Sequence, residues 1–147
     1  DGHEQCVSNK GKAFKGRKCA EKVNIEYRYM QADMFNLYPA IGAVNALRSN
    51  YNFTMLPVVK SNFDSCAMKI DNRKAEPPEM ARGQISRTCL YMEGAYKRYS
   101  MSKSQRQLMN AWDKMYPVDL WECERAKRIT ALQGNTNSVV QSRCKGN

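Results

Sequence analysis

Two polar side chains with different chemical uses lie three residues apart in the segment 35–53. Asn45 offers an amide oxygen, which can bind a hard cation, and Arg48 offers a guanidinium fork that fits a phosphate. Their spacing places them on one side of a helix, together with the apolar Ile41 and Val44. Two interpretations stay open: both groups are satisfied inside the protein, or they hold a cation and a phosphate.

The usual catalytic sets are incomplete. A Ser-His-Asp or Cys-His constellation needs a histidine, and His3, near the start of the sequence, is the single one. The sequence contains neither a Walker loop nor the G-x-G-x-x-G pattern, and no carboxylate pair stands out for acid–base work. Residue types alone therefore indicate binding more clearly than they indicate a reaction.

A short helix at residues 40–49, with Pro39 in its first turn, is predicted to position Asn45 and Arg48. Residues 1–24 are expected to be a basic loop, and residues 25–34 fit a helix or a strand. The other predicted elements are a half-buried strand at 67–71 and helices at about 79–99, 103–115 and 120–132.

Local signals mark the ends of the last two helices. Ser102 or Ser104 suits the start of the first, with Leu108, Trp112 and Met115 expected to face inward. Asp119 with Glu122 resembles a capping box for the second, and Gly134 suits its end. The expected architecture is α+β, mainly helical with a small sheet.

The charge indicates a polyanionic partner, with nucleic acid as the first candidate. The chain has 147 residues, enough for one domain, and 24 Lys and Arg against 14 Asp and Glu give a net charge of +10. Arg82 and Arg87 stand near the start of the helix predicted at 79–99, where the helix dipole disfavours cations, so phosphate contact is a reason for their presence.

The six cysteines favour disulfides and an oxidising compartment. The chain lacks C-x-x-C and has one histidine, so zinc-ligand spacing is absent. Cys6 and Cys19 bracket a Lys- and Gly-rich loop and are predicted to form a local bridge. The remaining four leave three pairings open: Cys66, Cys89, Cys123 and Cys144.

A membrane role is the weakest interpretation. The sequence has no run of 18 apolar residues, as a spanning helix requires. Its basic residues do not gather on one face of an amphipathic helix, as a cationic protein acting on membranes would require.

Several blocks of the sequence, in a fixed order, resemble the bacterial endonuclease I family of periplasmic or secreted non-specific nucleases. The most specific blocks lie within 36–50, 72–92, 107–118, 121–125 and 133–135, among them Asn36-Leu37-Tyr38-Pro39-Ala40-Ile41-Gly42 and Asn72-Arg73-Lys74-Ala75-Glu76-Pro77-Pro78.

The resemblance implies a ββα-metal nuclease that hydrolyses phosphodiester bonds in DNA, with RNA as a further substrate, and no sequence preference. It maps the family's Mg²⁺-holding Asn onto Asn45 and gives Arg17 the role of steadying the cleaved phosphate. A basic cleft is then expected to be lined by Arg48, Lys74, Arg82 and Arg87.

The chain departs from the family where the reaction is carried out. It lacks the Glu-His-Val-Val-Pro-Ala motif, whose His is the general base and whose Glu binds the metal, and it has Phe35 and Thr136 where the family usually has His. Residues 1–147 thus correspond to the larger, C-terminal part of a single nuclease domain, and alone they should be inactive. Either a separate N-terminal peptide of the same protein supplies the motif, or the chain is a catalytically silent homologue that binds nucleic acid.

Overall fold

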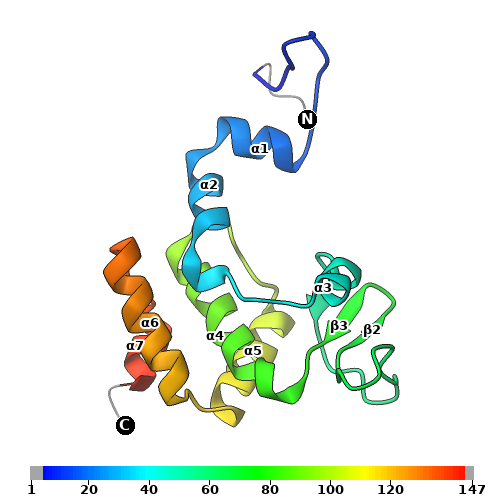
Figure 1. Cartoon of the computed structure of the whole chain (residues 1–147), viewed down its shortest axis with the longest axis vertical. Helices are drawn as coiled ribbons and strands as arrows, with labels where there is room; N and C mark the ends of the chain where they lie inside the picture. Colours follow the sequence, from blue (N-terminus) through cyan, green and yellow to red (C-terminus); the bar gives the residue numbers. More distant parts are fainter. Residues whose placement is uncertain (1–4, 145–147) are drawn as a thin grey trace. The chain divides into compact units, whose positions relative to one another are not determined.

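A computed structural model of the chain describes residues 5–144, and its fold is α+β, mainly helical with one small three-stranded sheet (Figure 1). The chain divides into two compact units, residues 1–37 and 38–147. The single nuclease domain over 1–147 stays a prediction, and His3 lies outside the described residues.

The first unit is helical where a loop was expected. Within residues 1–24 the structure has α1, Arg17–Val23, after a short bridge that pairs Val7 with Ala13. The ambiguous segment 25–34 contains α2, Ile25–Ala32, and it is followed by the 3₁₀ turn η1, Met34–Asn36. The loop expectation was wrong at α1, where a helix begins directly after Gly16, whose φ of 65° is one that glycine adopts without strain.

The predicted Cys6–Cys19 disulfide is confirmed and ties α1 to the start of the unit. The two Cα atoms lie 5.3 Å apart, and both cysteines are buried. Asn24 caps α2, since its side-chain oxygen accepts from the backbone N–H of Tyr27 at 2.8 Å.

The second unit contains the sheet and five helices among its described residues. Its elements are α3 (Gly42–Arg48), β1 (Asn52–Phe53), β2 (Lys69–Asp71), β3 (Lys74–Glu76), α4 (Glu79–Ala95), α5 (Lys103–Met115), α6 (Leu120–Gln133) and α7 (Ser138–Cys144). The sheet order is β1-β3-β2, with β3 parallel to β1 and antiparallel to β2.

The predicted ends of α5 and α6 are confirmed to within a residue. Ser102 accepts from the backbone N–H of Gln105 at 3.2 Å, and Asp119 accepts from that of Glu122 at 2.6 Å. Gly134 adopts a φ of 81° and ends α6 in the left-handed conformation that glycine allows.

Three expectations about helices are corrected. The helix α4 ends at Ala95 and not near Tyr99, because the chain turns back there and the backbone N–H of Met101 donates to Glu93. The short helix α3 begins at Gly42, so Pro39 precedes it. Met115 was expected to face inward but is 65% exposed at the last turn of α5.

The core of the second unit lies between α4 and α5. Met101, Met109 and Trp112 are buried there, with Phe53 of β1 packed against them. The helices approach closely at Gly83 of α4, where an added Cβ would lie 2.6 Å from the carbonyl oxygen of Tyr116. Glycine is therefore required at this crossing.

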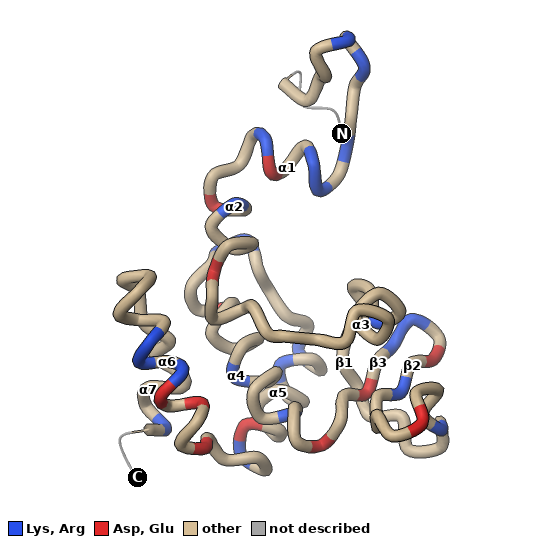
Figure 2. The backbone as a smooth tube through the Cα atoms, viewed as in Figure 1, with Lys and Arg blue, Asp and Glu red and all other residues tan. Residues whose placement is uncertain are grey.

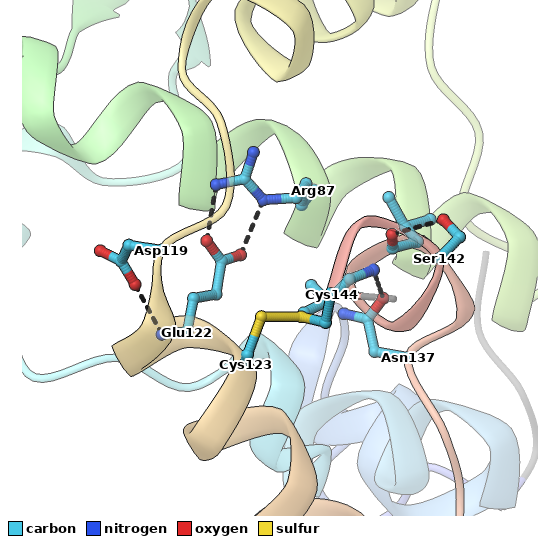
Figure 3. The surroundings of a disulfide bond; sticks show 9 residues. Arg87, Asp119, Glu122, Cys123, Asn137, Ser142 and Cys144 are labelled. Carbon is cyan, nitrogen blue, oxygen red and sulfur yellow. Dashed lines mark hydrogen bonds and ion pairs between the residues drawn. A yellow bond between two sulfur atoms is a disulfide. The ribbon is translucent and has the colours of Figure 1, made fainter. Parts of the chain in front are cut away.

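A second disulfide joins Cys123 of α6 to Cys144 of α7 and settles the pairing that the sequence left open (Figure 3). Cys66 and Cys89 are free thiols. Two disulfides in one small chain are typical of an oxidising compartment. None of the helices in residues 5–144 combines the length and apolar character that crossing a membrane requires.

Candidate nucleic-acid interface

Asn45 lies on the outside of α3. The helix has no buried residue, Asn45 is exposed, and Ile41 just before the helix is 66% exposed. The expectation that Asn45 faces inward beside apolar residues was therefore wrong, and the half-buried residues of α3 are Val44 and Arg48. Within residues 5–144 the Asn45 side chain has no hydrogen-bond partner, so the interpretation that its amide is satisfied inside this part of the protein is excluded.

Arg48, one turn further along α3, is half-buried and has a donor without an acceptor. Its guanidinium carbon lies 4.3 Å from the centre of the Phe53 ring, an attractive cation–π contact. Its Nε is buried and has no hydrogen-bond partner among the described residues. Burial lowers the pKa of this guanidinium. A buried donor of this kind needs an acceptor, and a phosphate oxygen is one that would fit.

Lys74 is exposed at the start of β3, and the sheet brings it beside the end of α3. Its Cα pairs with that of Asn52 in β1, the residue before Phe53, on which Arg48 stacks. Figure 2 shows basic residues at the start of β3 next to α3. Lys74 therefore lies near the α3–β1 connection in the chain, on the sheet face opposite to the Phe53 ring on which Arg48 stacks.

Arg82 does not belong to this surface. Its side chain is 13% exposed, and Nη2 donates to Oε1 of Glu76 at 2.6 Å. Nε donates to the Pro77 carbonyl and Nη1 to the Tyr116 hydroxyl. The expectation that Arg82 contacts phosphate is corrected, because its nitrogens already hold β3, α4 and the end of α5 together.

Arg87 is a core residue, and its predicted phosphate contact is also corrected. The residue is 2% exposed, and its Nε and Nη2 donate to the two carboxylate oxygens of Glu122 at 2.8 and 2.6 Å (Figure 3). Nη1 donates to Asp113 at 3.3 Å and to the Tyr116 carbonyl at 2.7 Å. Burial lowers the pKa of Arg87, but the hydrogen bonds and charges of Glu122 and Asp113 outweigh it and raise the pKa overall.

Arg17 belongs to the first unit and opens α1. It is exposed directly after Gly16, and exposed Lys15 and Lys18 flank this turn. A guanidinium so placed is free to meet an anion.

Asn45 by itself does not make a Mg²⁺ site. Among residues 5–144 the structure has no group of three His, Cys, Asp or Glu side chains that could hold a metal ion. Mg²⁺ prefers octahedral oxygen ligands that include a carboxylate. Among the described residues, Asn45 can supply one oxygen ligand to Mg²⁺, but a complete set of ligands is absent from residues 5–144.

Sequence reasoning missed the residues that fix the approach to α3. The Tyr38 ring lies 4.1 Å from the guanidinium carbon of Arg125 in α6, and its hydroxyl accepts from Arg125 at 3.3 Å. Thr88 of α4 donates to the same hydroxyl at 3.4 Å. Burial raises the pKa of Tyr38. Because Arg125 lies 87 residues from Tyr38, local patterns carried no signal of this contact.

Comparison with known proteins identifies the family. The model of the family Endonuclease I matches residues 3–144, and the chain belongs to this family. It is 44% identical over 133 residues to an extracellular deoxyribonuclease of Aeromonas hydrophila, covering 88% of this chain and 58% of that protein. It is 41% identical over 146 residues to Endonuclease-1 of Buchnera aphidicola, covering 97% and 56%.

A periplasmic deoxyribonuclease of Aeromonas hydrophila is 43% identical, with 88% of this chain and 55% of that protein covered. The chain thus spans a little more than half the length of these relatives.

Proposed function

We propose that this chain is the phosphate-binding part of a non-specific, metal-dependent endonuclease that hydrolyses DNA and also RNA. The observation that carries the proposal is the unpaired Nε of Arg48, three residues after the exposed Asn45 in α3. Family membership supports it, since relatives are named endonuclease and deoxyribonuclease.

The roles follow from the chemistry of each side chain. Arg48 and Lys74 bind backbone phosphates, and Arg17 holds the phosphate that is cleaved. Asn45 supplies one oxygen to a bound Mg²⁺, which when present stabilises developing negative charge. Contacts to phosphates carry no base information, so binding is independent of sequence. The ββα-metal character of the site is part of this proposal.

The general base and the carboxylate ligand come, in this proposal, from a Glu-His segment outside the described residues. A second candidate function is favoured by the lack of a metal-binding group within residues 5–144: a homologue that binds nucleic acid without cutting it. The names of the Aeromonas relatives and the two disulfides support a secreted or periplasmic location.

A plasmid assay separates the two candidates. The chain alone should bind supercoiled DNA without nicking it, and adding a peptide that carries the Glu-His motif should start cleavage that chelation of Mg²⁺ stops. RNA tested in the same way should also be cut. Failure of the chain to bind either nucleic acid would contradict both candidates, whereas binding without cutting in the presence of the peptide would favour the silent homologue.

A further inference from the structure

The tip of the β2–β3 hairpin has an unusual residue. Asp71 and Lys74 pair across the two strands, so the loop between them has two residues, Asn72 and Arg73. Their φ angles are 43° and 59°, which is the pattern of a type I′ turn.

Asparagine suits the first position of this turn, but the second strongly prefers glycine because φ is positive there. An arginine at φ 59° clashes with its own backbone where glycine would not. Arg73 is therefore a poor choice for the stability of the hairpin.

The Arg73 side chain has no internal role in the described part of the chain. It is exposed, and no carboxylate of residues 5–144 lies within ion-pair distance of it. Lys69, across the same hairpin, behaves differently: its Nζ donates to the Leu56 carbonyl and pairs with Glu76 at 3.3 Å. Of the three basic residues of the hairpin, Lys69 is therefore used for folding, while Arg73 and Lys74 are exposed.

The free arginine adjoins the candidate interface. Arg73 precedes Lys74, whose strand pairs with β1, and β1 carries the Phe53 ring on which Arg48 stacks. Arg73 and Lys74 are therefore adjacent exposed cations where the hairpin turns into β3, and Figure 2 shows basic residues there next to α3.

We propose that Arg73 is a further phosphate-binding residue, and that the hairpin tip extends the nucleic-acid interface beyond Arg48 and Lys74. This inference rests on the proposed function and names the backbone phosphate as the group that Arg73 binds. The planar guanidinium of Arg73 can donate two hydrogen bonds to a phosphate. Within residues 5–144 no carboxylate is paired with it.

Stability and binding of Arg73→Gly should change in opposite directions. Glycine relieves the turn, so the midpoint of urea unfolding should rise, while affinity for duplex DNA should fall about tenfold at low salt. The slope of log affinity against log salt should become shallower by about 0.9, as expected for one lost phosphate contact. Asn72→Gly, which alters the same turn but keeps every charge, is the matched control and should bind as the parent does.

Arg73→Gln removes the charge but keeps a side chain at the positive φ, so it does not relieve the strain of the turn. Its affinity for duplex DNA should fall as much as that of Arg73→Gly, and this test holds even if the glycine variant folds poorly. Parent-like affinity and salt slope for Arg73→Gln would overturn the inference and leave the proposed function standing. A parent chain that does not bind DNA would instead refute the proposed function.

Discussion

Replacing Asn45 with alanine should collapse Mg²⁺-dependent cleavage in a preparation that contains the Glu-His segment. In the proposed site Asn45 is one of two protein ligands, so its loss leaves the metal poorly held. Because the side chain is exposed and has no partner within residues 5–144, the fold should survive, and the basic residues should still bind DNA. The measurement is the cleavage rate against Mg²⁺ concentration, with DNA affinity at fixed salt beside it.

Two further variants sharpen this result. Asn45→Asp should retain some activity, since a carboxylate oxygen can replace the amide oxygen, although its charge also repels phosphate. Asn50→Ala removes another exposed amide just past α3 and should cut as fast as the parent. Parent-like cleavage by Asn45→Ala would show that the metal assignment is wrong. Unfolding of Asn45→Ala would show that the amide has a structural role.

Removing the carboxylate of Glu122 should destabilise the protein by about 3–5 kcal/mol. Glu122 is 2% exposed and accepts two hydrogen bonds from Arg87, so Glu122→Ala leaves a buried guanidinium without its main partner. Asp113 offers Arg87 only a 3.3 Å contact and is itself held by Arg143 at 2.7 Å. Urea unfolding measures the change.

Glu124, two residues further along α6, provides the matched control. It pairs with Arg128 at 2.7 Å, but the two side chains are 51% and 74% exposed. Such an exposed pair contributes little because solvent screens it, so Glu124→Ala should scarcely change stability. Equal losses for Glu122→Ala and Glu124→Ala would contradict the placement of Arg87 in the core.

The helices whose ends depend on neighbouring residues could be predicted from the sequence. Ser102, Asp119 and Gly134 each act within three or four residues, so α5 and α6 were placed correctly. The end of α4 could not be placed because the spacing of Tyr96 and Tyr99 continues the helical rhythm after the chain has turned. The carboxylate of Glu93 holds this turn, since it accepts hydrogen bonds from the backbone N–H of Met101 and from Arg106.

Charge was the least reliable guide to the site. Arg87 and Arg82 were assigned to phosphate because their partners Glu122 and Glu76 could not be identified from spacing alone; Glu122 is 35 residues from Arg87. One signal could have found Glu122: it lies seven residues before the buried Ile129, on the same face of α6. The two disulfides show the same limit: the local Cys6–Cys19 bridge could be predicted from the sequence, whereas the pairing of Cys123 with Cys144 could not.

A salt titration of duplex-DNA binding tests the central claim most directly, because it asks whether the chain holds nucleic acid through its phosphates. With about six phosphates contacted, affinity should fall roughly 10³-fold between about 50 and 200 mM salt, and equally for duplexes of unrelated sequence. Binding that does not change with salt, or that depends on sequence, would contradict the claim.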